Sequence, residues 1–149
     1  MSTKNNHCPR ILVVDDDATM RLLTAHALRK AGFEVLEACS ADEGATHVCD
    51  ANIDAIVTDV EMPGALNGYD LARRARSKCP AMTVFVVSGS KNSVRRALPP
   101  YGRFFEKPVD PRILIAEMRD SLRKFQSRCG NPRFRHAGCF SCVRPRRAS

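Results

Sequence analysis

The sequence predicts an α/β fold with a doubly wound five-stranded parallel sheet and helices on both faces. Short apolar runs rich in β-branched residues alternate along the chain with segments whose apolar residues recur at helical spacing. This alternation of strands and helices is typical of a parallel sheet covered on both sides. Polar residues also stand at the ends of several apolar runs, where open α/β folds place their functional sites.

The first part of the chain predicts a strand, a helix and a second strand. The run RILVV at residues 10–14 is apolar and β-branched, and Asp15 ends it. The segment from about 18 to 30 has apolar residues at helical spacing, and Gly32 follows as its stop. A second apolar run then covers Phe33–Ala38.

The middle of the chain predicts a helix followed by the central strand. Ser40 and Glu43 have the spacing of a capping box, so a helix is expected from Ser40 to about Cys49. The apolar run Ala55–Thr58 ends on Asp59, and a carboxylate cannot stay in an apolar core. Asp59 is therefore expected at the carboxyl edge of the sheet.

The last part of the chain predicts two more strands and the helices around them. The expected elements are a helix over about 69–78, a strand over 83–87 that ends at Ser88, at most two helical turns over 92–98, a strand over 103–105, and a helix from Asp110 to about Phe125. Pro99-Pro100 stops the short turn, and Asp110-Pro111 has the residue types of an N-cap and a first helical position.

Length and composition predict one globular domain in the cytoplasm. The chain has 149 residues with an ordinary apolar fraction of 44%, which argues against overall disorder. No apolar run has the ~18–20 residues of a membrane span, and the first residues lack the apolar core of a signal peptide. Seven scattered cysteines are therefore expected to be reduced thiols.

The net charge of +8 belongs to the end of the chain. Residues 1–120 hold equal numbers of basic and acidic side chains, whereas residues 121–149 hold 8 basic residues and no acid. We therefore expect a folded domain over 8–126 and a basic, disordered tail over 127–149, with weak non-specific binding of polyanions. A zinc site in this tail is an open alternative, with the ligands Cys129, His136, Cys139 and Cys142.

The polar residues at the predicted strand ends form a chemically coherent set. The first strand leads to Asp15 and Asp16, the third to Asp59, the fourth to Ser88 and the fifth to Lys107. Because parallel strands end at the same edge of a sheet, these five residues can converge. Three clustered carboxylates favour a shared cation, and hard oxygen ligands suit Mg²⁺. A lysine and a hydroxyl beside an aspartate suit phosphoryl transfer to that aspartate.

With these residues in order, the sequence resembles the receiver domain of bacterial two-component response regulators over roughly residues 8–125. The family's motifs fall on the acidic pair Asp15-Asp16, the phosphoacceptor Asp59 before Met62-Pro63, the loop glycine Gly68, the hydroxyl residue Ser88, and Lys107-Pro108. The resemblance implies a flavodoxin-like strand order, 2-1-3-4-5. It also implies a stand-alone, chemotaxis-type receiver without an output domain of its own.

The resemblance further implies a function and the partners for it. Asp59 would take a phosphoryl group from a histidine kinase or a phosphotransfer protein, with Mg²⁺ held by Asp15, Asp16, Asp59 and the backbone carbonyl of Glu61. Ser88 and Lys107 would contact the phosphoryl group, and partner binding would then change. The family's aromatic switch position falls on Phe104, which lacks a hydroxyl. Such a protein is no enzyme beyond self-phosphorylation and slow self-dephosphorylation.

Two rival interpretations stay open at this point. Asp15, Asp17 and Thr19 satisfy the D-x-D-x-T pattern of haloacid dehalogenase-type phosphatases, with Asp15 as nucleophile and Asp17 as acid. Against it, no later strand end carries an acid pair, Asp59 has no role, and Asp17 is expected to cap the first helix. The other rival is a receiver that is never phosphorylated and serves only as an interaction module. The intact residue set argues against that rival.

Overall fold

The computed structural model describes residues 8–50, 52–80, 82–89 and 102–129. The elements are β1 (Arg10–Val14), α1 (Ala18–Lys30), β2 (Glu34–Ala38), α2 (Ala41–Asp50), β3 (Ala55–Asp59), α3 (Gly68–Lys78), β4 (Thr83–Ser88), β5 (Gly102–Glu106) and α4 (Pro111–Cys129). The five strands form one parallel sheet in the order β2-β1-β3-β4-β5. The predicted fold class and strand order are therefore confirmed.

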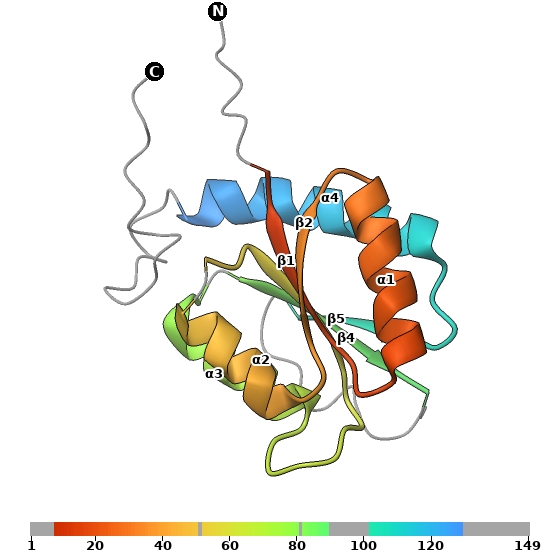
Figure 1. Ribbon diagram of the computed structural model, residues 1–149. Helices are drawn as coiled ribbons and strands as arrows, with labels where there is room; N and C mark the ends of the chain where they lie inside the picture. Colours follow the sequence, from red (N-terminus) through yellow and green to blue (C-terminus); the bar gives the residue numbers. More distant parts are fainter. Residues whose placement is uncertain (1–7, 51, 81, 90–101, 130–149) are drawn as a thin grey trace, which may run out of the picture.

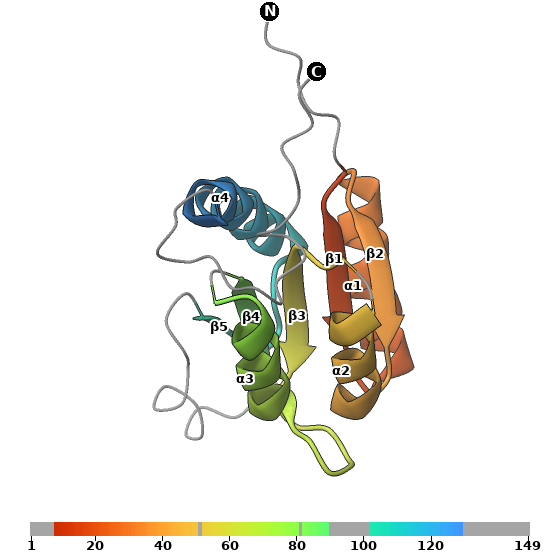
Figure 2. The same ribbon diagram turned by 90° about the vertical axis from the view of Figure 1, so that its left-hand side faces the viewer.

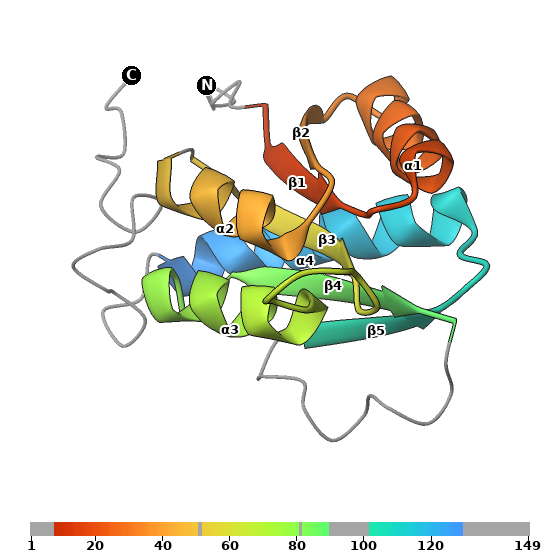
Figure 3. The same ribbon diagram turned by 60° about the horizontal axis from the view of Figure 1, so that its bottom comes forward.

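The sheet lies between two layers of helices. Helices α2 and α3 lie side by side on one face, and α1 and α4 cover the other face (Figure 1, Figure 3). Each face has its own apolar cluster. Leu12, Val14 and Ile56 point toward α2 and α3, and their neighbours in the strands, Ile11 and Val57, belong to the cluster under α1 and α4.

The position of each strand explains its sequence pattern. All residues of β3 and β4 are buried, because these central strands are covered on both faces. The outer strands β2 and β5 mix exposed and half-buried residues with few buried ones. Figure 2 shows β2 at the edge of the sheet beside β1. An apolar run in this chain therefore predicts a central strand, and a mixed run predicts an edge.

The parallel register brings the functional strand ends together. Val14 of β1 pairs with Thr58 of β3, and Asp59 pairs with Val87 of β4. The residues that follow these pairs therefore emerge at one edge of the sheet.

Side-chain caps fix the starts of the helices near this edge. The Asp17 carboxylate accepts hydrogen bonds from the Thr19 and Met20 amides, so its predicted role as the N-cap of α1 is confirmed. Asn67 and Asp70 form a capping box at the start of α3, which the sequence analysis missed. Both caps lie at the carboxyl edge of the sheet.

Some boundaries differ from the prediction. Helix α4 continues to Cys129 rather than ending at about Phe125. A helix can continue past its last apolar position, because its backbone hydrogen bonds do not depend on an apolar stripe. The residues that typically end a helix, Gly130 and Pro132, come only after Cys129 in the sequence. The predicted domain boundary at residue 126 thus falls inside α4, and that boundary stays a prediction. The turn expected over 92–98 and most of the basic tail lie outside the described residues.

Within the described ranges, no helix is long and apolar enough to cross a membrane.

Candidate functional site

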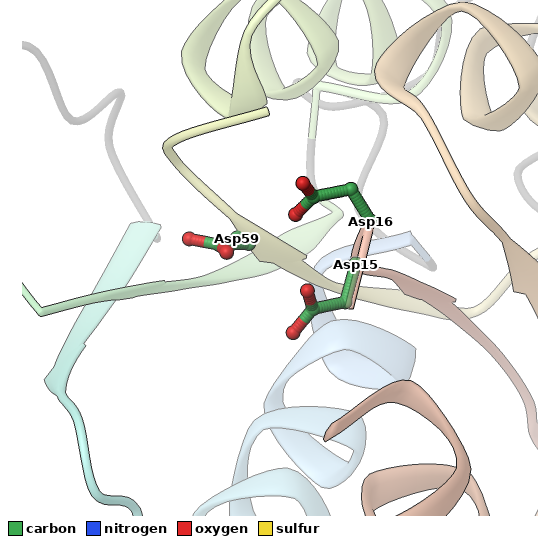
Figure 4. Close-up of side chains that lie close together, drawn as sticks. All are labelled: Asp15, Asp16 and Asp59. Carbon is green, nitrogen blue, oxygen red and sulfur yellow. The ribbon is translucent and has the colours of Figure 1, made fainter. Parts of the chain in front are cut away.

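Three carboxylates meet at the carboxyl edge of the sheet. Asp15 and Asp16 follow β1, and Asp59 is the last residue of β3 (Figure 4). One carboxylate oxygen from each residue lies within 4.8 Å of the others. Asp15 and Asp59 are buried, with 9% and 8% of their surface exposed, and Asp16 is exposed. The cluster is therefore partly enclosed and open on one side.

Within the described residues, Lys107 forms ion pairs with this cluster. Its Nζ donates a hydrogen bond of 2.9 Å to Asp59 Oδ2 and lies 3.8 Å from Asp15 Oδ2. The Lys107 amide donates to the Ser88 carbonyl at 2.9 Å, which fixes the backbone just after β5. Burial lowers the pKa of Lys107, but the hydrogen bond to Asp59 and the nearby carboxylates outweigh it, so the net shift is upward. Lys107 therefore stays charged.

The positive charge of Lys107 alone does not balance three carboxylates. Burial raises the pKa of Asp15 above its ordinary value. The Asp17 amide, which donates to Asp15 Oδ1 at 2.9 Å, and the Lys107 charge oppose this shift, and the carboxylates of Asp59 and Asp16 add to it. Each added negative charge thus makes the ionised cluster less stable. The site favours a further cation or a protonated Asp15.

Gly68 lets the start of α3 approach the end of β3. A Cβ atom at this position would overlap the Asp59 carbonyl oxygen and lie 3.0 Å from the Asp59 carbonyl carbon and from Val60 Cα. The Gly68 amide donates to the Val60 carbonyl at 3.2 Å across the same contact. No other residue type fits here without moving the backbone of Asp59. The loop glycine found by resemblance thus has a steric reason.

The other predicted site residues lie around the cluster. Ser88 is fully buried at the end of β4, the strand next to Asp59. Glu61 is exposed, and its amide donates to Asp59 Oδ1 at 3.3 Å. Phe104 lies in β5, is half-buried, and packs against the apolar cluster under α2 and α3. Phe104 is therefore separated from β3 by β4, and it is not part of the carboxylate cluster.

An apolar cavity of about 140 Å³, which was not predicted from the sequence, opens beside the carboxylates. Asp15, Asp59 and Lys107 line one end of the cavity. The remaining lining is almost entirely apolar and comes mainly from α1, α4 and the strands beneath them. Leu23 of α1 lines the cavity and is 59% exposed. The acidic site thus has an apolar neighbour that a partner can reach.

Two further observations concern residues near the site. The Asp17 side chain is engaged in capping α1, which leaves the phosphatase pattern without its acid. Arg21 donates a hydrogen bond from Nη1 to the Asp15 carbonyl at 2.8 Å. No sequence pattern points to Arg21, because a single arginine in an amphipathic helix gives no signal of such a contact.

Comparison with known proteins identifies a family over most of the chain. The family model described as response regulator receiver domain matches residues 11–119. Among curated proteins, the chain is 32% identical over 117 residues to the CAI-1 autoinducer sensor kinase/phosphatase CqsS of Vibrio cholerae, covering 75% of this chain and 17% of that protein. It is 31% identical over 119 residues to the phosphate regulon transcriptional regulatory protein PhoB of Pseudomonas aeruginosa, covering 76% of this chain and 52% of that protein.

Solved structures agree with the family match. A response regulator receiver protein from Sinorhizobium medicae superposes with a TM-score of 0.76 at 28% identity, covering 80% of this chain and 98% of that one. The response regulator protein TrrA from Thermotoga maritima, in complex with Mg²⁺ and BeF, superposes with a TM-score of 0.68 at 25% identity, covering 76% and 98% of the two chains. The chain thus spans about half or less of these two curated relatives but nearly the whole of each solved receiver.

Proposed function

Since the chain belongs to the response regulator receiver domain family, we propose that it is the phosphoacceptor switch of a two-component phosphorelay and that Asp59 is the residue phosphorylated. The observation that carries the proposal is the pairing of Asp59 with Lys107 inside a cluster of three carboxylates. A carboxylate that only stabilised the fold through an ion pair would not need two further acids beside it. An acceptor does, because the cation that those acids hold can neutralise an incoming phosphate.

The chemistry at Asp59 is a direct transfer. A carboxylate oxygen of Asp59 attacks phosphorus, the bond from phosphorus to the donor atom breaks, and an acyl phosphate forms. The donor nitrogen or oxygen leaves with the bonding electrons. Lys107, which already contacts Asp59 Oδ2, lies where it can pair with the new phosphoryl oxygens. The buried Ser88 hydroxyl is at the neighbouring strand end, and we assign it to the same role.

The donor set suits Mg²⁺. The three carboxylates provide hard oxygen ligands within 4.8 Å of one another, and their mutual repulsion adds to the raised pKa of Asp15. Asp15, Asp16 and Asp59, together with the backbone carbonyl of Glu61, would hold the ion. Bound there, Mg²⁺ would supply the positive charge that offsets the phosphoryl oxygens.

The apolar cavity indicates where a phosphoryl donor would dock. A histidine kinase or phosphotransfer protein must bring its histidine to Asp59, and the surface beside Asp59 includes the cavity between α1 and α4. The large apolar residues most exposed in the described part of the chain are Leu22 and Leu23 of α1 and Ile113 of α4. Leu23 also lines the cavity, and an exposed apolar side chain at a hollow is typical of a protein-binding surface. We assign this face to the donor.

The signal would leave through the opposite side of the site. Contact of the phosphoryl group with Ser88 and Lys107 would pull on the ends of β4 and β5. Phe104 of β5 pairs with Val86 of β4, so it lies on the strand that such a pull would displace. Phe104 is only half-buried, which leaves it room to move further inward. Such a movement would change the surface offered to a downstream protein.

The test is the intact mass of the protein after incubation with acetyl phosphate. Wild-type protein should gain the mass of one phosphoryl group with Mg²⁺ and none with EDTA, and Asp59→Asn should gain none. Asp42→Asn is the matched control, since Asp42 is an exposed carboxylate of α2 outside the cluster. An adduct that survives Asp59→Asn but disappears in Asp15→Asn would favour the phosphatase. No adduct in any variant would favour the interaction module.

A further inference from the structure

Arg21 connects the acidic site to the edge of the sheet. Its Nη1 donates to the Asp15 carbonyl at 2.8 Å, and its Nε lies 3.5 Å from Glu37 Oε1 on β2. The side chains of Arg21 and Glu37 are mostly buried, with 19% and 24% exposed. Arg29, two helical turns further along α1, contacts the other oxygen of Glu37 at 3.1 Å. Glu37 thus receives two arginines, but only Arg21 is also bonded to the backbone of the carboxylate cluster.

The peptide unit that Arg21 holds joins two of the three carboxylates. The carbonyl of Asp15 belongs to the planar peptide unit that includes the Cα atoms of both Asp15 and Asp16. The Asp15 amide is held on the other side by the Ala38 carbonyl at 3.1 Å. A displacement of this peptide unit would move both Cα atoms, and with them both carboxylates, relative to Asp59. The hydrogen bond from Arg21 opposes this displacement.

The geometry points to Arg21 as a positioning residue for the cation site, an inference that rests on the proposed function. Arginine suits this task, because its planar group can donate to a carbonyl and to a carboxylate in fixed directions at once. Glu37 balances the charge of Arg21, so that the guanidinium can lie beside a cation site with less repulsion. Arg21 acts on the site only through Asp15 and Asp16.

The test measures Mg²⁺ binding directly, by NMR titration of the amide signals of Asp15, Asp16 and Asp17, without phosphorylation. Arg21→Met should weaken Mg²⁺ affinity by about tenfold, as loss of groups that orient metal ligands usually does. Arg21→Lys keeps the charge and one donor, so its affinity should fall between those of Arg21→Met and wild type. Arg29→Met is the matched control, because Arg29 lies on the same helix and also contacts Glu37. This variant should bind Mg²⁺ like wild type.

Simple charge repulsion predicts the opposite change in Mg²⁺ affinity. If Arg21 acted only as a nearby positive charge, Arg21→Met would bind Mg²⁺ more tightly than wild type and Arg21→Lys would match wild type. Tighter or unchanged binding in Arg21→Met therefore overturns the inference, as does an equal loss in Arg21→Met and Arg29→Met. If Arg21→Met does not fold, unchanged binding in Arg21→Lys overturns it. Failure of the wild-type protein to bind Mg²⁺ would instead refute the metal site of the proposed function itself.

Discussion

The substitution Gly68→Ala tests how closely α3 approaches β3, the strand that ends at Asp59. The added Cβ would overlap the Asp59 carbonyl oxygen and lie 3.0 Å from two further backbone atoms. Carbon atoms prefer a separation of about 3.5–4.0 Å, and the contact with the carbonyl oxygen is closer than both carbon contacts, so the start of α3 and the end of β3 must separate by roughly 1 Å or more. Both sides of this contact are backbone, and a rotamer change cannot relieve it.

The magnitude follows from three terms. Forcing extra volume into a packed contact costs about 1–3 kcal/mol. Weakening the hydrogen bond from the Gly68 amide to the Val60 carbonyl adds about 1 kcal/mol. Replacing glycine by alanine in a helix returns about 0.5–1 kcal/mol. The free energy of unfolding should therefore fall by about 1–3.5 kcal/mol, which lowers the melting temperature by roughly 2–14 °C for a domain of this size.

The assay compares melting temperatures and rates of adduct formation with acetyl phosphate. Because a shift of about 1 Å at a reacting group can cost up to a hundredfold in rate, phosphorylation of Gly68→Ala should also slow markedly. Gly89→Ala is the matched control, since Gly89 follows Ser88 and a Cβ there meets no atom of the described residues within 4 Å. Equal melting temperatures for Gly68→Ala and Gly89→Ala would refute the steric argument.

Three further predictions concern charge, capping and the end of the chain. The pKa of Asp15 is raised in the fold, so ionisation of Asp15 lowers the free energy of unfolding as pH rises. In denaturant titrations with EDTA present, the stability of Asp15→Asn relative to wild type should therefore increase from pH ~4 to pH ~7, and a constant difference would contradict this. Asp17→Ala should lose about 1 kcal/mol of stability yet still form the adduct, because Asp17 caps α1; loss of the adduct by mass would give Asp17 a role in the chemistry. A chain truncated after Cys129 should form the adduct, and its free energy of unfolding should lie within about 1 kcal/mol of that of the full chain. If the full chain binds one equivalent of zinc tightly and the truncated chain does not, the prediction of a disordered basic tail is contradicted.

The fold could be predicted from the sequence because the strongest signals are local. The central strands are continuous apolar runs that end at polar residues, so Asp59 and Ser88 marked the ends of β3 and β4. Parallel topology then placed those ends at one edge. Helix ends that depend on backbone hydrogen bonds leave less signal in the sequence. For this reason the predicted end of α4 was about Phe125, whereas the helix continues past its apolar stripe to Cys129.

Contacts between distant residues could not be predicted in this way. The predicted strand ends put Lys107 and Asp59 at the same edge of the sheet, but spacing along the chain does not reveal the direct hydrogen bond between them, since they lie 48 residues apart. The reason for Gly68 appears only when the Asp59 carbonyl is seen against the start of α3. The Arg21–Glu37 pair joins a helix to an edge strand, and either residue alone is an ordinary surface charge in the sequence.

The position of the phosphoryl group tests the central claim most directly. After treatment with acetyl phosphate and Mg²⁺, borohydride reduction converts an aspartyl phosphate into homoserine, which peptide mass spectrometry can locate. The account predicts homoserine at position 59 alone, with Asp15 and Asp16 recovered unchanged and no homoserine in a sample treated with EDTA. Homoserine at position 15, or a phosphorylated protein with Asp59 intact, would contradict it.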